Sequence, residues 1–476
     1  MARICPQAVP AWYPASFTNL VNLISLGHPV PNATYVTPGA NSSSPIPTRD
    51  PRESEDCLFL DVFVPKGVLR KAGKGKGAPV LVWFYGGGYT LGHKNQNPAG
   101  LIAASGNSSN GDVIYVAMNY RLGALGFSSG PTFNAQGGTS NVGLYDQRFA
   151  LEWVQKKIHL FGGDKNRVTV VGLSAGGGSI MHQITAYGDQ KGKVPFQQAV
   201  PQSPGWAAVQ SVVQQEDTFQ RYMELTNTSS LAELRALSSQ ALITANAQQV
   251  AYDTAFGTFV YGPVVDGLFS PQLPSQLLAQ GRFNKNIRIL VGHNSNEGAF
   301  FTAPTIQSDA ALLTQLKAAY PFAPQKSLDY ITQTLYPAVF DGTYPYTSQY
   351  QRASMILAES IFTCNTNYLS TAYGNKTYSY LFAVPPGFHG SDVAYTYYDG
   401  GALSPATGVT NRTIAIALQK FITSFAEGGE PEADGIRQFD MYGPNASVLK
   451  LNISGIDEVR DSNANARCSW WQKGLY

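Results

Sequence analysis

A serine in a glycine-rich turn is the first residue of this sequence that could act as a nucleophile. Ser174 lies in Gly-Leu-Ser-Ala-Gly, after a β-branched run at 168–171 and before an apolar segment of helical character. A tight strand-to-helix turn lifts such a serine off a sheet, and Gly172 and Gly176 keep side chains away from its flanks. The first amides of the helix would face a developing oxyanion. The motif is short, so a glycine-rich turn without chemistry is the alternative interpretation.

A serine nucleophile needs a base to take its proton and an acid to orient that base. On a turn of this kind the three residues follow in the order serine, acid, histidine. The sequence has six histidines. Two of them, His293 and His389, lie well downstream of the serine, whereas His182 falls in the helix just after it. His389 follows a predicted strand at 378–384 and is the predicted base. The alternative is that it is an exposed loop histidine without a catalytic role, which is the more common case for a lone loop histidine.

The predicted acid is Glu297, which directly follows an apolar strand at 286–292. The carboxyl ends of parallel strands are where functional side chains gather. Asp266, in Val-Val-Asp-Gly, is the second candidate, and a structural turn is its alternative interpretation. His293 has no better acid before it than Asp266, so we interpret it as a turn residue or a support for the site.

Three consecutive glycines at 86–88 could supply the donors that a tetrahedral intermediate requires. They follow a predicted strand at 79–85, and their bare backbone lets amide groups approach a substrate closely. A flexible surface loop is the alternative, but the flanking aromatic residues and the preceding core strand argue against it. Gly87, Gly88 and Ala175 are the predicted oxyanion donors.

Composition excludes several other classes of protein. A net charge of +2 gives no basic surface for nucleic acid. No apolar run approaches the roughly 18 to 20 residues that span a bilayer, so we expect a soluble protein. No cofactor and no metal are expected. The partner that the candidate residues predict is a small-molecule or lipid ester.

The asparagine and cysteine patterns favour a secreted protein. Four cysteines are compatible with two disulfides in an oxidising compartment, with three possible pairings. Residues 1–5 have no signal-peptide pattern, so a secretory peptide would lie outside this chain. N-glycans are possible at the Asn-x-Ser/Thr sequences that begin at Asn32, Asn41, Asn107, Asn227, Asn375, Asn411, Asn445 and Asn452.

The order of predicted elements indicates an α/β protein. Strands are predicted at 58–64, 112–120 and 196–202 besides those above, and long helices at 142–159 and 412–426. Strands that alternate with helices predict a mostly parallel sheet, here with helical insertions at 207–285 and 305–375. We expect one domain over 1–476, with residues 6–56 as a flap that contains an amphipathic helix at 16–26.

Taken together, these motifs resemble the carboxylesterase type B family, which includes carboxylesterases, cholinesterases and some fungal lipases. The similarity runs from Cys5 nearly to the last residue, including the ending at 453–476. The motifs that carry it lie at 54–62, 84–89, 118–123, 141–148, 161–164, the Ser174 turn, Glu297-Gly298 and His389-Gly390.

The resemblance implies an α/β-hydrolase fold with Ser174, Glu297 and His389 as the catalytic triad. It also implies the oxyanion hole of Gly87, Gly88 and Ala175. It pairs the cysteines as Cys5 with Cys57 and Cys364 with Cys468, and it implies an ion pair between Arg148 and Asp164 beside the serine turn.

This chain departs from the family in three ways. Relatives carry several dozen residues, which form the first strands of the sheet, before the position of Cys5, so we expect missing N-terminal strands. Leu173 precedes the serine where many relatives have glutamate, and the flap lacks the tryptophan on which a quaternary ammonium stacks. Both argue against choline esters.

The predicted function is hydrolysis of carboxylic esters through an acyl-enzyme, with Trp206 lining the acyl pocket or simply packing in the core. One alternative is a lipase that acts on long-chain acylglycerols, with the helix at 16–26 as a lid. Another is a truncated, inactive or binding member of the family.

Overall fold

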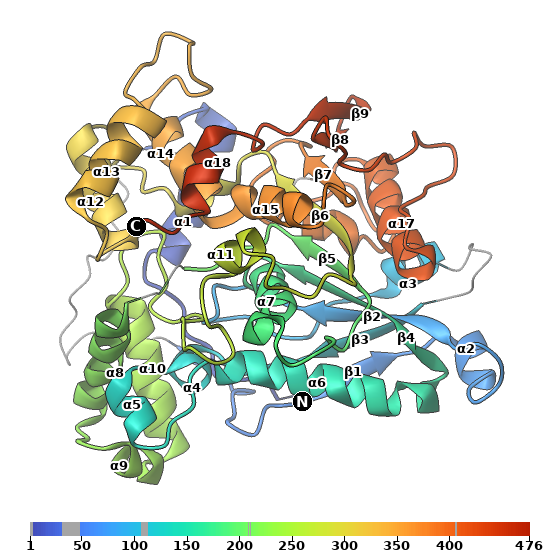
Figure 1. The fold of residues 1–476 in the computed structure, drawn as a ribbon, viewed down its shortest axis with the longest axis horizontal. Coiled ribbons are helices and arrows are strands. Elements are labelled where there is room, and N and C mark those ends of the chain that lie inside the picture. The colour runs from blue at the N-terminus through green and yellow to red at the C-terminus, as the bar shows by residue number, and fades with distance from the viewer. Residues whose placement is uncertain (1–2, 31–47, 106–112, 208, 210, 405–406) are drawn as a thin grey trace.

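The computed structural model describes residues 3–30, 48–105, 113–207, 209, 211–404 and 407–476. Its centre is one sheet of nine strands in the order β1-β3-β2-β4-β5-β6-β7-β8-β9 (Figure 1). The strands are β1 (Leu60–Phe63), β2 (Ala78–Phe84), β3 (Ile114–Met118), β4 (Gly163–Leu173), β5 (Gln198–Gln202), β6 (Arg288–Asn294), β7 (Tyr378–Phe382), β8 (Ser447–Asn452) and β9 (Gly455–Arg460).

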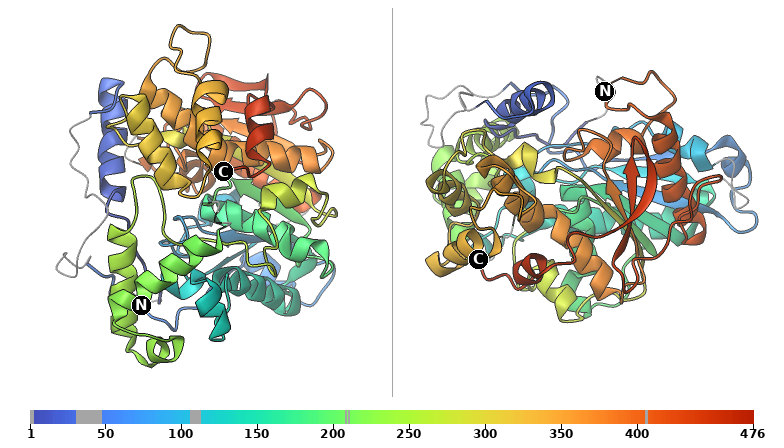
Figure 2. Two further views of the ribbon diagram at one scale, coloured as in Figure 1. Left: turned by 60° about the vertical axis from the view of Figure 1, so that its left-hand side comes forward. Right: turned by 90° about the horizontal axis from the view of Figure 1, so that it is seen from above.

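The sheet is parallel from β3 to β8, and only β1 and β9 pair antiparallel at its two edges. The central strands are largely buried, and helices cover both faces of the sheet. Helices α6 (Val142–Lys157), α7 (Ala175–Ile184) and α15 (Cys364–Ala372) pack on one face, and α3 (Ala99–Ser105), α16 (Ser391–Thr396) and α17 (Arg412–Gly428) lie against the other (Figure 2). This arrangement is the predicted α/β architecture.

Two groups of helices extend from the carboxyl ends of the strands (Figure 1). The first, which we call the α8–α10 lobe, consists of α4 (Gly123–Phe127), α5 (Pro131–Ala135), α8 (Val212–Thr226), α9 (Leu231–Ala236) and α10 (Ser239–Tyr252). The second contains α1 (Tyr13–Leu26), α12 (Asp309–Ala319), α13 (Gln325–Tyr330) and α14 (Gln349–Ala358). The remaining helices are α2 (Lys66–Arg70), α11 (Pro274–Ala279) and α18 (Ala466–Trp471).

Within the described ranges, no helix is both long and apolar enough to cross a bilayer. The flap predicted at 6–56 contains α1, which begins three residues before the predicted helix, and its stretch 31–47 lies outside the described residues.

Both predicted disulfides are present in the structure. Cys5 bonds to Cys57, and Cys364 at the start of α15 bonds to Cys468 in α18. The second bridge closes a loop of 104 residues, a length for which the chain-entropy argument gives about 4–5 kcal/mol of stabilisation. It ties the C-terminal end of the chain to the helices beside the sheet.

Candidate active site

Ser174 occupies the sharp turn between β4 and α7 with an unfavourable backbone conformation. Its φ is 57° and its ψ is −120°, a combination that costs an L-residue of order 1–3 kcal/mol. Three backbone hydrogen bonds hold it there: its N–H donates to Gln202 at 2.9 Å, and its carbonyl accepts from Gly178 at 2.8 Å and Gly205 at 3.1 Å. The surrounding structure therefore maintains a strained serine at the carboxyl end of a central strand.

The glycines around the serine are required by close backbone contacts. A Cβ on Gly176 would lie 2.1 Å from the carbonyl oxygen of Phe84, and one on Gly172 would lie 2.8 Å from the backbone of Gly176. A Cβ on Gly178 would meet the carbonyl oxygen of Gly205 at 2.3 Å. Such distances leave no room for a side chain, so the first turn of α7 can approach the sheet only with glycine there.

The glycine loop after β2 lies directly against the serine turn. A Cβ on Gly86 would be 2.8 Å from the carbonyl oxygen of Leu173 and 3.0 Å from the Cβ of Ser174. Gly87 and Gly88 have φ of 112° and 59°, which favour glycine. Neither of their amides donates a hydrogen bond within the described part of the chain. They are therefore available beside the serine.

The third predicted donor, the amide of Ala175, is the first of α7. The first N–H groups of a helix have no acceptor within it, so this amide is also available to a ligand. Of the three predicted donor residues, Gly88 and Ala175 line the same cavity as Ser174.

Glu297 and His389 form a buried, hydrogen-bonded pair. His389 Nδ1 lies 2.5 Å from Glu297 Oε2, between a side chain that is fully buried and one that is 10% exposed. Glu297 also accepts from Ser203 Oγ at 2.6 Å and from the backbone N–H of Asn294 at 2.5 Å. Burial acts to raise the pKa of Glu297, but the imidazole and these donors together hold that pKa below its usual range. The carboxylate is therefore ionised and oriented toward the imidazole.

The other nitrogen of His389 is free to accept a proton. Nε2 is buried and has no hydrogen-bond partner among the described residues. The ring is held between Phe362 and Phe301, with centroids 4.3 Å and 5.2 Å away. The next residue, Gly390, lies beside Leu173, since a Cβ there would be 3.5 Å from Leu173 Cδ2. The imidazole is thus fixed next to the serine turn.

Phe362 is placed by a short π-helical turn, η5 (Glu359–Thr363), between α14 and α15. Such turns occur mostly as single interruptions of α-helices and often at functional sites. Ser360, Ile361 and Phe362 line the cavity that contains Ser174. Glu359 and Thr363, at the two ends of the turn, line a different cavity.

The cavity at Ser174 has a volume of about 380 Å³. Gly88 and Ala175 border it, and Trp206, Phe301 and Phe362 are among its apolar lining residues. Trp206 is buried and packs against His182 with ring centroids 5.3 Å apart, so it serves both as cavity wall and as core. We refer to this space as the catalytic cavity.

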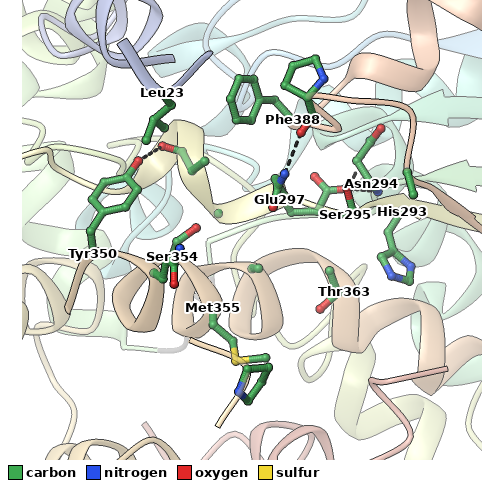
Figure 3. A pocket seen from close by; sticks show the side chains of 18 of the residues that line it. Leu23, His293, Asn294, Ser295, Glu297, Tyr350, Ser354, Met355, Thr363 and Phe388 are labelled. Carbon is green, nitrogen blue, oxygen red and sulfur yellow. Dashed lines mark hydrogen bonds between the residues drawn. The ribbon is translucent and has the colours of Figure 1, made fainter. Parts of the chain in front are cut away.

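A second and larger cavity, of about 860 Å³, lies on the turn that carries the acid. Tyr350 and Ser354 of α14, with Phe388 from the loop before the base, surround it together with Glu297 (Figure 3). Ser174 does not line it. The second cavity therefore contacts the acid without giving access to the nucleophile.

A polar network that was not predicted lies behind the acid. Asn294 Nδ2 lies 3.1 Å from Ser203 Oγ, 3.2 Å from Glu297 Oε1 and 3.1 Å from Oδ1 of the buried Asp392. Asp392 also accepts from Tyr380 at 2.6 Å. Burial, followed by the nearby charge of Glu297, raises the pKa of Asp392. Only the spacing of Asp392 three residues after the base could have suggested it.

Asp266 and His293, which the sequence did not favour as acid and base, have structural roles. Asp266 accepts from Asn141 Nδ2 and from the N–H groups of Leu268 and Ser270, which is the geometry of a turn. His293 lies within β6, and its Nε2 is 3.2 Å from Asn463 Nδ2. Neither contacts the Glu297–His389 pair.

The expected ion pair between Arg148 and Asp164 is wrong. Arg148 donates instead to the side chain and the carbonyl of Gln183 at 2.7 Å and 3.1 Å, while Asp164 accepts from the N–H of Asn166. Arg148 is on α6, which packs against α7. Its guanidinium therefore lies at the end of α7, where the last carbonyl oxygens have no N–H donor within the helix.

His182 is buried in α7 and is neutral. Its Nδ1 lies 3.1 Å from Ser270 Oγ, and burial lowers its pKa to about 3. In the unfolded chain a histidine titrates near pH 6.5, so above that pH neither state binds this proton. As the pH falls below about 6.5 the unfolded state alone gains the proton, and the fold is destabilised progressively down to about pH 3.

We therefore expect His182→Gln to lessen the acid sensitivity of the fold. The slope of unfolding free energy against pH, from urea titrations between pH 6 and pH 4, should fall by up to about 1.4 kcal/mol per pH unit relative to the parent. His28, an exposed histidine, provides the matched control, because His28→Gln should leave the slope unchanged. Equal slopes in all three proteins would contradict a neutral buried His182.

One grouping of metal-ligand types occurs among the described residues: Glu359 with Cys364 and Cys468. Both sulfurs belong to the disulfide, and Arg467 donates to both oxygens of Glu359, at 2.8 Å and 2.6 Å. Metal binding there would require thiolates that the disulfide does not provide.

Comparison with known proteins identifies the family of this chain. The profile of the carboxylesterase family matches residues 5–471. The chain is 39% identical over 485 residues to "Carboxylesterase patB" of Penicillium expansum, covering 99% of this chain and 85% of the relative. It is 31% identical over 440 residues to "Lipase 1" of Geotrichum candidum, covering 84% and 74% of the two chains.

A "Secreted lipase" of Arthroderma benhamiae is 31% identical over 450 residues, with 88% and 83% covered. Among solved structures, Aspergillus niger EstA superposes with a TM-score of 0.77 at 25% identity, over 90% of this chain and 86% of that one. The predicted α/β-hydrolase fold is confirmed. The family profile covers all nine strands of the sheet, and the chain therefore belongs to the carboxylesterase family of carboxylic ester hydrolases.

Proposed function

We propose that Ser174, His389 and Glu297 form the catalytic triad with which this protein hydrolyses carboxylic esters. One observation carries the proposal: a buried imidazole whose Nδ1 is bound to an ionised carboxylate and whose Nε2 is free, fixed beside a strained serine. A neutral imidazole of this tautomer is a general base, and the carboxylate stabilises it when it becomes charged.

In the proposed reaction, His389 Nε2 takes the proton of Ser174 while Oγ forms a bond to the ester carbonyl carbon. The resulting oxyanion accepts from the amides of Gly87, Gly88 and Ala175. The imidazolium then gives its proton to the departing alkoxide as the carbon–oxygen bond breaks, which leaves an acyl-serine and a free alcohol. Water repeats the sequence, with His389 as base, and releases the acid.

A fluorophosphonate probe tests this proposal and separates it from an inactive or binding protein. The probe phosphonylates only a serine that a neighbouring base activates, so we expect one labelled peptide, containing Ser174, in mass spectra of the digested protein. Ser295, which is exposed on the loop of the acid and whose hydroxyl bonds to no histidine among the described residues, should stay unlabelled. A protein that takes up no label would exclude the triad as assigned.

A lipase is the second candidate function, and α1 favours it. Phe17, Val21 and Ile24 of this helix are 51%, 62% and 64% exposed, although Phe17 also packs on Phe300 at 5.2 Å. An exposed apolar helix face of this kind suits a lipid surface. Rates that rise sharply once an ester forms micelles would favour the lipase, and rates that saturate below that point would favour an esterase for dissolved substrates.

Secretion with N-glycans is also part of the proposal. Asn227 and Asn445 begin Asn-x-Ser/Thr sequences on the exposed surface, whereas Asn411 caps α17 by accepting from Ile414 N–H. The exposed pair would therefore be modified most readily in a secretory compartment.

A further inference from the structure

Polar side chains form a cluster on the wall of the catalytic cavity that the α8–α10 lobe provides. Gln214 and Thr218 of α8 and Asp253, the residue that caps the end of α10, all line this cavity together with Ser174. One face of α8 carries Gln214, Thr218 and Arg221, which are spaced four and three residues apart. This face packs toward the end of α10. The lobe and the serine turn lie on separate parts of the molecule (Figure 1), so the cavity connects the nucleophile to this cluster.

Asp253 is the charged member of the cluster, and one of its oxygens is held in place. Arg221 Nε donates to Oδ2 at 3.1 Å, and Arg221 also pairs with Glu224 at 3.2 Å. This geometry uses Oδ2 and leaves Oδ1 for a ligand. Burial raises the pKa of Asp253 despite the neighbouring guanidinium, because the carboxylate has lost much of its water to the cavity wall. A hydrogen-bond donor on a ligand would replace the water contacts that the Asp253 carboxylate loses on burial.

The other two side chains fit the same kind of ligand group. The Thr218 hydroxyl donates to the carbonyl of Gln214 at 2.9 Å, so its oxygen can still accept. The Gln214 amide can donate or accept. Arg221 balances the charge of Asp253, which disfavours a cationic ligand group. A neutral hydroxyl, which both donates and accepts, matches the cluster.

We propose that the Gln214–Thr218–Asp253 cluster selects esters that carry a hydroxyl group at a distance from the ester bond, with the Asp253 carboxylate accepting a hydrogen bond from that hydroxyl. The inference rests on the proposed function of Ser174. The apolar side chains between the serine turn and the lobe, including Trp206 and Phe259, would contact the body of such a substrate. A site that hydrogen-bonds a hydroxyl discriminates strongly against the analogue that lacks it.

Paired ester series test the inference. Ethyl esters of straight-chain acids from butanoate to decanoate are compared with the corresponding ω-hydroxy esters, and kcat/KM is measured for each pair. Because distance from the ester is the variable, the ratio of hydroxylated to plain ester should pass through a maximum at the chain length that reaches Asp253. At that length we expect the hydroxy ester to be favoured about tenfold or more.

Asp253→Asn should reduce that ratio about tenfold, and using the ratio cancels any effect that is common to both esters. Glu224→Gln is the matched control, because it removes the other carboxylate partner of Arg221 without lining the cavity. It should leave the ratio and its optimal chain length unchanged.

A ratio near one at every length, or an equal fall in both variants, would overturn the role of Asp253. Neither result would affect the triad, because plain esters would still be hydrolysed. Failure of the triad would appear separately, as hydrolysis of both ester series by Ser174→Ala.

Discussion

Replacing Ser174 with alanine is expected to abolish ester hydrolysis while the protein stays folded. The acyl-enzyme requires Oγ, and no other hydroxyl shares the serine turn with three free amides. We expect kcat to fall by at least about 10⁴-fold, the scale on which serine hydrolases lose activity without their nucleophile. The measurement is hydrolysis of a 4-nitrophenyl ester at saturating concentration, with far-ultraviolet circular dichroism as the check on folding.

The backbone strain at Ser174 allows a second substitution to test the same residue. Glycine adopts a φ of 57° without the penalty of a Cβ, so Ser174→Gly should be as inactive as the alanine variant but more stable by about 1 kcal/mol. Ser295→Ala, on the exposed loop of the acid, should retain activity. If the alanine and glycine variants still turned over ester, the nucleophile would have to be another residue.

Glu297→Gln is the second change with a large expected effect. An amide in this position has one acceptor oxygen where the carboxylate has two. Its NH₂ group would face either His389 Nδ1, at the place of Oε2, or Ser203 Oγ and the two N–H donors of Asn294, at the place of Oε1. The imidazole would lose the partner that fixes its tautomer and stabilises its charge. We expect kcat to fall by about 10³ to 10⁴-fold, as when an orienting carboxylate becomes an amide in comparable triads.

The pH dependence of stability gives an independent readout of the same substitution. The pKa of Glu297 is lower in the fold than in the unfolded chain, so its ionised form favours the fold above about pH 4.5. That contribution is lost as the pH falls through the lowered pKa. The glutamine variant should therefore be less stable than the parent at neutral pH, and the difference should narrow in acid.

Asp392→Asn provides the control for the glutamate experiment. Asp392 shares Asn294 with Glu297 but does not bind His389, so its amide variant should lose far less kcat than Glu297→Gln. Comparable losses of kcat in the two variants would mean that activity depends on the whole network of Glu297, Asn294 and Asp392, and not on the bond between Glu297 and the imidazole alone.

The sequence predicted the sheet well where strands are apolar and bounded by glycine or proline. The strands expected at 79–85, 196–202 and 286–292 correspond to β2, β5 and β6 within two residues at each end. The hairpin of β8 and β9 was not predicted. β8 is mostly buried, but its partner β9 is partly exposed and carries Asp457, Glu458 and Arg460 among its residues. Such an edge strand lacks the apolar run on which the prediction depended.

Chain order could select the acid and the base, because each follows a strand of a parallel sheet. Their supports could not be predicted in this way. Ser203 follows β5, Asn294 ends β6 and Asp392 lies in the first turn of α16, and only the folded protein brings them together. The expected Arg148–Asp164 pair failed for the same reason: the nearest acceptor in space, Gln183, is not visible as a partner in the sequence.

The π-helical turn η5 sets the positions of Phe362 and Cys364 relative to each other. Phe362 within the turn packs on His389, and Cys364 just beyond it is bonded to Cys468. Removing one residue from the turn would return the segment to α-helical spacing and rotate one side against the other by about 100°. The disulfide fixes one side, so the aromatic wall beside the base would have to move. The extra residue of this turn therefore determines where the aromatic wall of the substrate cavity stands relative to the disulfide-bonded helices.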